Sequence, residues 1–209
     1  SEYDLDELNL DDLLGEQPVF EEEPVPEEDV DDDFDDDFED EYDESDVDLL
    51  DFSRLQNSDM KFTKEKMDLV AEIEEVAIMF TPRCNQNGIR LVFEGTEDII
   101  PVYGDKGRIK QVMVNLLDNA IKYTPEGGRI QIDIDFDKKN NLVTVSVEDN
   151  GKGIHKEDIP KVTQKFYKGK GSKRGSGIGL ALVKEIISAH GGEFIVESEY
   201  GVFTRMTFT

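Results

Sequence analysis

From about residue 49 onward, the apolar positions of the chain follow helical or strand periods. A 3.6-residue period predicts a helix over 68–81, with an apolar stripe made of Leu69, Val70, Ile73, Val76, Ala77 and Phe80. Two further amphipathic stretches predict helices over 105–123, which ends before Pro125, and over 178–189. Residues 49–60 have the pattern of a helix end.

Alternating apolar and polar positions predict five strands, over 89–93, 129–135, 142–147, 193–197 and 203–208. The polar stretch 138–141 joins the second of these strands to the third as a turn. Helices and mostly hairpin-linked strands in this order predict an α+β fold. We expect a two-layer sandwich in which helices cover one face of a mixed, mostly antiparallel sheet.

Residues 1–50 are too acidic and too poor in apolar side chains to form a hydrophobic core. They contain 26 acidic residues and no basic residue, whereas the rest of the chain contains 24 acidic and 23 basic residues. The formal net charge of −27 therefore belongs to a tail, and we expect residues 1–48 to be disordered. Phe34, Phe38 and Tyr42 recur every four residues, so a segment that folds against a partner stays open as an alternative.

The composition also limits the partners and the location of the protein. The near-neutral part of the chain has no basic stripe that would neutralise phosphates, so nucleic acid is not an expected partner. Cys84 is the only cysteine, which suits a reducing cytoplasm, and no apolar run is long enough to span a membrane. Because the chain begins at Ser1 and ends within a predicted strand, we expect a cytoplasmic fragment of a longer protein, whose other parts could anchor it in a membrane.

The predicted helix over 105–123 carries the first candidate site. Its predicted apolar stripe consists of Ile109, Val112, Met113, Leu116, Leu117, Ala120 and Ile121. At 100° per residue, Arg108, Asn115, Asn119 and Lys122 fall on one polar stripe beside it. Asparagine is a poor helix former, and a merely solvated face would favour Glu, Lys or Gln instead. Amide oxygens are hard, neutral ligands that suit Mg²⁺, so the stripe indicates a magnesium site next to a cation. A solvated polar face is the alternative.

The motif DNGKG at 149–153 directly follows a predicted strand. Such a motif is consistent with a plain turn. It also suits an adenine pocket, because glycines let a ligand approach the backbone and a carboxylate only accepts hydrogen bonds. The exocyclic amine of adenine would donate to Asp149, whereas the carbonyl oxygen of guanine would be repelled by it.

Residues 175–180, with the sequence GSGIGL, open the third predicted helix. Glycines there permit positive φ, and unpaired backbone N–H groups at a helix start attract phosphate. The preceding glycine-rich segment holds five cations and indicates a lid over phosphates: Lys165, Lys168, Lys170, Lys173 and Arg174. A Rossmann site is not expected, because the preceding strand and the later acidic residue are missing. Together with the two earlier motifs, these features favour Mg·ATP as the ligand.

In this order the motifs resemble the boxes of the sensor histidine kinases of two-component signal transduction, within the GHKL superfamily that includes DNA gyrase and heat-shock chaperones. NLLDNAIKYTP at 115–125 is similar to the N box, DNGKGI at 149–154 to the G1 box, QKFYKG at 164–169 to the F box, and GSGIGLALVKEI with HGG at 175–192 to the G2 box and its sequel. The resemblance spans about residues 50–209. It implies a Bergerat-type α/β sandwich, a catalytic ATP-binding domain over 61–209, and a remnant of a dimerisation-domain helix and linker over 49–60.

The resemblance also implies roles for individual residues. Asn115 and Lys122 would act in catalysis, and Asn119, helped by Asn115, would ligate Mg²⁺. Lys122 and Tyr123 would border the phosphates and the sugar, and Asp149 would hold the adenine amine. The other implied ATP-binding residues are Gly151, Gly153, Ile154, Lys168, Arg174, Gly175, Ser176, Gly177, Ile178, Gly179 and Leu180.

Two positions depart from the family pattern. Thr163 stands where the F box often has its first Phe. Asn115 stands where the ATP-hydrolysing relatives carry a catalytic Glu, so the resemblance implies phosphoryl transfer rather than hydrolysis.

In this family, ATP phosphorylates a histidine on a separate two-helix dimerisation domain, and a response regulator acts downstream. Neither His155 nor His190 lies in an acceptor helix motif, and we expect the ring of His190 to meet free carbonyls at a helix end. The expected enzyme is therefore a histidine protein kinase whose phosphoacceptor lies outside this chain. A serine kinase of the anti-sigma type and a non-catalytic nucleotide-binding scaffold are the alternatives.

Overall fold

The computed structural model describes residues 62–94, 99–169 and 176–209. All of these belong to one compact unit of the chain, Glu41–Thr209. The predicted acidic tail and the predicted helix end over 49–60 lie outside the described residues.

One five-stranded sheet forms the first layer of this unit. Its strand order is β2-β4-β5-β7-β6; β2 pairs with β4 in parallel, and the other three pairs are antiparallel. The predicted mixed, mostly antiparallel sheet is therefore confirmed. The strands are β2 (Arg90–Glu94), β4 (Arg129–Asp137), β5 (Leu142–Asp149), β6 (Phe194–Glu199) and β7 (Phe203–Phe208).

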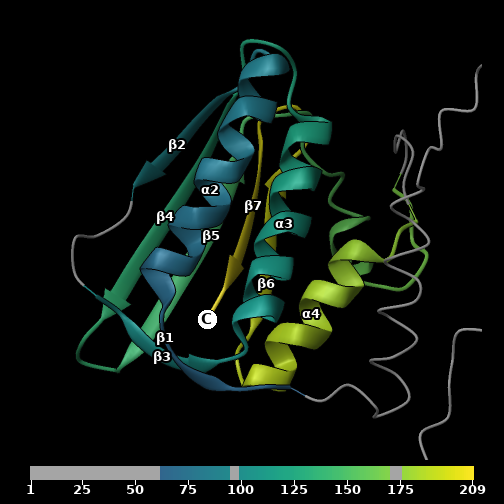
Figure 1. Ribbon diagram of the computed structural model, residues 1–209. Helices are drawn as coiled ribbons and strands as arrows, with labels where there is room; N and C mark the ends of the chain where they lie inside the picture. Colours follow the sequence, from purple (N-terminus) through teal and green to yellow (C-terminus); the bar gives the residue numbers. More distant parts are fainter. Residues whose placement is uncertain (1–61, 95–98, 170–175) are drawn as a thin grey trace, which may run out of the picture. The chain divides into compact units, whose positions relative to one another are not determined.

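Three helices form the second layer: α2 (Leu69–Gln86), α3 (Lys106–Tyr123) and α4 (Gly179–His190). All three lie on the same face of the sheet (Figure 1). The prediction that helices cover one face is thus confirmed. The carboxylates of Asp68 and Asp105 accept hydrogen bonds from backbone N–H groups in the first turns of α2 and α3, so both helices begin at a capped residue.

Helix α2 runs five residues beyond its predicted end at residue 81 and contains Pro82. Proline removes one intrahelical hydrogen bond, but Pro82 is on the exposed face, where water can satisfy the carbonyl left behind. The buried stripe meanwhile continues from Phe80 to Cys84, which is fully buried. Packing of that face therefore outweighs the local effect of the proline.

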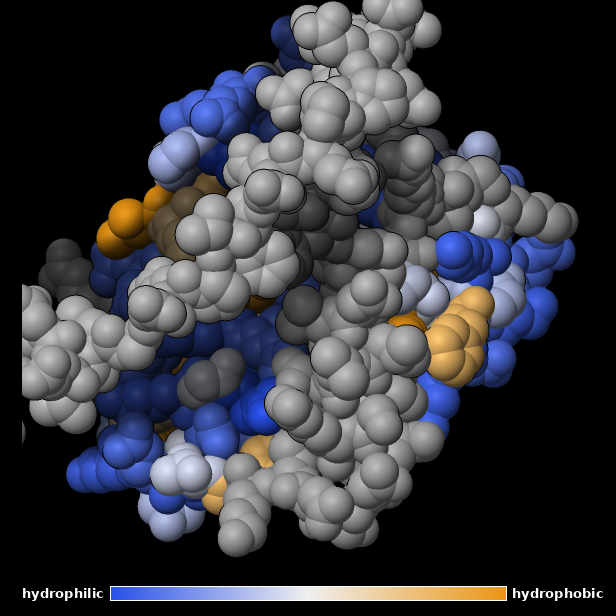
Figure 2. Space-filling view, turned by 45° about the vertical axis from the view of Figure 1, so that its right-hand side comes forward, coloured by the Kyte–Doolittle hydropathy of each residue, from blue (hydrophilic) through white to orange (hydrophobic). Residues whose placement is uncertain are grey.

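The hydrophobic core lies between the two layers. The whole predicted stripe of α3 is buried, from Ile109 to Ile121, and it packs with inward-facing side chains of the central strands such as Ile132 and Val147. On the face shown in Figure 2, the described surface is mostly hydrophilic, with a few separate apolar groups. Among the described residues, no helix combines the length and the apolar character needed to cross a membrane.

A second, two-stranded sheet was not predicted from the sequence. Strand β1 (Glu65–Asp68) pairs in antiparallel fashion with β3 (Pro101–Gly104). Each strand has only four residues and little apolar alternation, and their pairing joins parts of the chain more than thirty residues apart. Local patterns cannot indicate such a pair.

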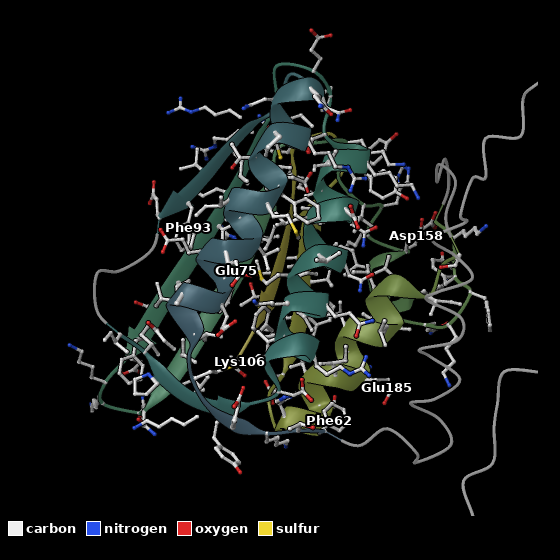
Figure 3. All side chains as sticks on the ribbon, in the orientation of Figure 1. Phe62, Glu75, Phe93, Lys106, Asp158 and Glu185 are labelled. Atoms are coloured by element: carbon white, nitrogen blue, oxygen red, sulfur yellow. The ribbon has the colours of Figure 1, made fainter. Side chains whose placement is uncertain are left out.

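The first described residues lie against the C-terminal end of α4. The ring of Phe62, labelled in Figure 3, packs edge-on against His190, with 5.4 Å between ring centroids. Nζ of Lys64 donates to the carbonyl of Ala189 (2.9 Å). His190 Nδ1 lies 2.8 Å from the carbonyl oxygen of Ile186, and its Nε2 accepts from the backbone N–H of Asp105 (3.0 Å). The prediction that this ring meets a carbonyl at the helix end is confirmed.

Candidate functional site

Helix α3 contacts the turn that follows β5. The backbone N–H of Lys152 donates to the carbonyl of Tyr123, the last residue of α3 (3.2 Å). Gly151 lies so close that a Cβ there would overlap the same carbonyl oxygen. Only glycine fits this position, and the close approach fixes the DNGKG turn against the end of the helix.

Two helical turns earlier, α3 contacts the start of α4. A Cβ on Gly179 would lie 2.8 Å from Oδ1 of Asn115, so the glycine leaves room for this amide oxygen. Asn115 and Tyr123 are eight residues apart, a rise of about 12 Å along the helix. One helix therefore brings the predicted adenine turn and the predicted phosphate-binding helix start together, with the asparagine stripe between them.

The hydrogen bonds of the two asparagines define which way their amides face. Nδ2 of Asn115 donates to the carbonyl of Gln111, and Nδ2 of Asn119 donates to the carbonyl of Asn115, both at 3.0 Å. Because the nitrogens point back along the helix, the oxygens are the ends available to a ligand. Within the described ranges, no cluster of three His, Cys, Asp or Glu residues could hold a metal ion. Amide oxygens are hard, neutral ligands, which suit a cation that takes its other ligands from phosphate and water.

Asp149 is a buried carboxylate at the end of β5, with 5% of its surface exposed. Its Oδ1 accepts a hydrogen bond from the N–H of Gly151 (2.9 Å). The pKa of Asp149 is raised to about 6, mainly by burial; the Gly151 hydrogen bond lowers it and the nearby charge of Glu148 adds to the rise. Since Oδ1 is committed to the turn, Oδ2 is the atom that can accept from a ligand.

The hairpin between β6 and β7 supports the same turn from the other side. The N–H of Ile154 donates to Oγ of Ser198 (2.8 Å), and the N–H of Gly201 donates to the carbonyl of Lys152 (2.7 Å). Gly153 has φ +65°, and a Cβ there would overlap the carbonyl oxygen of Glu199. The turn is thus held by backbone contacts to α3 and to the hairpin at once.

Thr204 is a buried polar residue of this region that the sequence reading missed. It is 5% exposed, it lies directly opposite Asp149 in the β5–β7 register, and its Oγ1 is 3.1 Å from Oγ of Ser198. The signal was present, because Thr204 occupies an inward position of β7 together with the buried Met206 and Phe208. A polar residue at a core position of a strand indicates a polar neighbour.

Cationic side chains gather around Tyr123. Nζ of Lys122 lies 5.2 Å and Nζ of Lys152 lies 4.4 Å from the centroid of the Tyr123 ring. The resemblance implies that Lys122 and Tyr123 border the phosphates and the sugar. In the structure, the carbonyl of Tyr123 contacts the DNGKG turn, and Lys122 precedes Tyr123 at the end of α3. A cation within about 6 Å of the centroid of an aromatic ring is attracted to the face of that ring.

The start of α4 has the features of an anion site. Ile178 precedes the helix as a buried residue, and its side chain makes no capping hydrogen bond. The N–H of Ile178 itself donates to Oγ of Ser176 (3.3 Å), and Gly179 and Leu180 form the first turn. The N–H groups of that turn have no intrahelical partner and favour a negative ligand.

The segment of the predicted F box contacts this helix start. The N–H of Phe166 donates to the carbonyl of Gly177 (3.0 Å), and Gly177 has φ +73°. Lys168 is exposed, and Thr163 is half-buried. Arg174 and Gly175, the remaining predicted phosphate-binding residues, lie outside the described residues.

Comparisons with known proteins identify the family of the chain. Residues 104–209 match the family described as histidine kinase-, DNA gyrase B-, and HSP90-like ATPase. The chain belongs to this family. The sensor histidine kinase WalK of Bacillus subtilis (strain 168) is 35% identical over 166 residues, which cover 78% of this chain and 27% of WalK. The alginate biosynthesis sensor protein KinB of Pseudomonas aeruginosa is 34% identical, over 76% of this chain and 26% of KinB.

Solved structures define the place of the chain within the histidine kinase-like ATPases. The catalytic domain of histidine kinase ThkA is 31% identical and superposes with a TM-score of 0.60, over 71% of this chain and 96% of that domain. Full-length ShkA in complex with AMPPNP is 27% identical with a TM-score of 0.69, over 77% of this chain and 34% of ShkA. The predicted membership among sensor histidine kinase catalytic domains is therefore confirmed, as is the fold. The chain spans about a quarter of the length of WalK and KinB.

Proposed function

We propose that this domain binds Mg·ATP and transfers the γ-phosphate to a histidine on a separate dimerisation domain. The observation that carries the proposal is the double contact of α3, with the Asp149 turn at Tyr123 and with the start of α4 at Asn115. A nucleotide that spans these two contacts would place its base at one and its phosphates at the other. The AMPPNP complex of the similar protein ShkA supports the same ligand class.

Adenine recognition is assigned to Asp149. Its Oδ2 accepts from the exocyclic amine, while Oδ1 is held by Gly151. Gly151, Gly153 and Ile154 shape the pocket through backbone atoms, because their close contacts leave no room for larger rearrangement. At pH 7 the carboxylate is mostly ionised and acts only as an acceptor, so guanine, which presents a carbonyl oxygen there, is rejected.

Magnesium and phosphate binding are assigned to α3 and α4. Asn119, with Asn115, offers amide oxygens to the ion, which neutralises phosphate charge when it is bound. Lys122 and Lys168 offer cations, and the backbone of 175–180 offers N–H groups at the start of α4. Asn115 offers no carboxylate to activate water, so the site favours transfer to a nucleophile over hydrolysis.

The chemical step then depends on positioning and on charge. A neutral imidazole nitrogen is already nucleophilic, so no residue of this domain needs to remove a proton from it. The acceptor histidine belongs to the dimerisation domain, and a response regulator takes the phosphoryl group afterwards. A cytosolic location, in which ATP is abundant and the buried thiol of Cys84 stays reduced, fits this role.

Titration calorimetry with ATP, in the presence and absence of Mg²⁺, tests nucleotide binding by the whole chain. Transfer of label from [γ-³²P]ATP to an added histidine-bearing two-helix domain then tests the reaction. We expect magnesium-dependent binding and an acid-labile phosphorylated product. An acid-stable product would identify a serine kinase, and ATP binding without label transfer would identify a nucleotide-binding scaffold.

A further inference from the structure

Asp158 is a second buried carboxylate, at the start of the short 3₁₀ helix η2 (Ile159–Lys161), and it is 4% exposed (labelled in Figure 3). Its side chain makes no capping hydrogen bond to that helix. Oδ1 of Asp158 instead accepts from the hydroxyl of Tyr167 (2.7 Å), nine residues away in the predicted F box. A Cβ on Gly169 would lie 3.1 Å from Oδ2.

The opposite side of the same segment is attached to the start of α4. The N–H of Phe166 donates to the carbonyl of Gly177 (3.0 Å), and a Cβ on Gly177 would lie 2.9 Å from the carbonyl oxygen of Tyr167. Phe166 adopts φ +61°, which is uncommon for a residue with a side chain. Residues 166–169 are therefore held between Asp158 and the helix start, in a backbone conformation that only surrounding contacts maintain.

We propose that Asp158 is a positioning residue for phosphoryl transfer. Asp158 fixes Tyr167 and thereby holds Lys168 at the phosphates of ATP. This inference rests on the proposed function. Lys168 is exposed on a flexible four-carbon stem, and ordering it anew at each binding event would reduce affinity and rate. Because the hydroxyl of Tyr167 is bound to the buried carboxylate of Asp158, the backbone next to Lys168 is already ordered before ATP binds.

The chemistry of the Asp158–Tyr167 contact suits a lasting anchor. The hydrogen bond to Asp158 raises the pKa of the Tyr167 phenol, so the hydroxyl remains a donor throughout the neutral range. Nζ of Lys161, from η2, lies 5.9 Å from the centroid of the Tyr167 ring. The ring is thus attached at its hydroxyl and attracted at its face, both from the segment that carries Asp158.

The test compares Tyr167→Phe, Asp158→Ala and Asp158→Asn in the transfer assay with an added acceptor domain. Tyr167→Phe and Asp158→Ala should each lower kcat/KM for ATP about tenfold. Asp158→Asn, whose amide oxygen can still accept from the hydroxyl, should retain at least half of the activity. Tyr103→Phe, which removes a hydroxyl from a 72% exposed ring on β3, is the matched control and should leave kcat/KM unchanged.

A double-mutant cycle separates positioning from a merely structural role. In a Lys168→Ala background, Tyr167→Phe should cause little further loss, because the cation that it positions is gone. Fully additive losses, or wild-type kinetics of Tyr167→Phe, would overturn the inference. If Asp158→Ala does not fold, Tyr167→Phe still decides the question. A wild-type chain that fails to bind ATP would instead refute the proposed function.

Discussion

The turn after β5 contacts the end of α3, the segment before α4 contacts the start of α4, and the two are held by different kinds of contact. The turn at 149–154 is fixed on two sides, by the backbone of Tyr123 and by backbone atoms and the Ser198 hydroxyl of the β6–β7 hairpin. The segment at 166–169 is fixed by one phenol–carboxylate hydrogen bond and by one backbone bond to Gly177. The proposed adenine slot is thus fixed by several contacts, whereas the proposed position of Lys168 depends on one side-chain anchor that a single substitution can remove.

The largest effect expected on the rigid side comes from Asp149→Asn. The amide oxygen would turn to the N–H of Gly151, so its NH₂ group would face the donor amine of adenine. We expect ATP affinity to fall at least about 100-fold in calorimetry. Thermal stability should stay equal or rise, because the buried charge is removed. Asp135→Asn, at an exposed position of β4, is the control; retained affinity in Asp149→Asn would refute the assignment.

Gly153→Ala would show whether the rigid turn is also a structural requirement. Positive φ disfavours alanine by about 1–2 kcal/mol, and overlap with the carbonyl of Glu199 adds to this. We expect a loss of about 2 kcal/mol or more of unfolding free energy in denaturant titrations. Gly127→Ala is the matched control, because Gly127 also has positive φ but no atom within 4 Å of its Cβ position. Equal losses in the two variants would show that the backbone overlap is relieved.

The asparagine stripe lies between the two regions, and Asn119→Ala tests its assignment. We expect ATP to bind about tenfold more weakly in the presence of Mg²⁺ and almost normally without it, because the removed oxygen contacts the ion and not the base. Calorimetry at several Mg²⁺ concentrations measures this difference. An equal loss with and without magnesium would place Asn119 on the nucleotide itself.

The smallest expected effect is a pH dependence of the rigid side. The pKa of Asp149 is raised by burial to about 6 in the folded state, above its ordinary value, so the folded protein binds the proton more tightly than the unfolded chain. This group therefore stabilises the fold as pH falls through about 6, by on the order of 1 kcal/mol between pH 7 and 5.5. In denaturant titrations, the free energy of unfolding of the wild type should rise by this amount between pH 7 and 5.5, relative to that of Asp149→Asn. A parallel pH dependence of both proteins would contradict it.

Much of the fold was predictable because the apolar residues of its helices recur at helical spacing without interruption. The seven buried residues of α3 were identified by their spacing, and with them the neighbouring polar stripe of Asn115 and Asn119. The β1–β3 pair was not predictable, since four-residue strands with distant partners leave no local period. The end of α2 was misjudged because Pro82 is a strong local signal that the packing of Cys84 overrides.

The candidate site was predictable where its residues lie next to one another in the sequence. Asp149, Gly151 and Gly153 fall in a single run of sequence, and their contacts depend on that run. The supporting groups come from elsewhere: Ser198 and Thr204 from the last two strands. A hydroxyl that supports a turn forty-four residues away has no sequence period to reveal it.

The position of Phe62 has a consequence for the two ends of α4. Its ring packs against His190, the last residue of the helix, whereas the proposed phosphate site lies at the other end of these 12 residues, about 18 Å away along the helix axis. A substitution at Phe62 should therefore change the surroundings of His190 and leave the contacts at the start of the helix as they are.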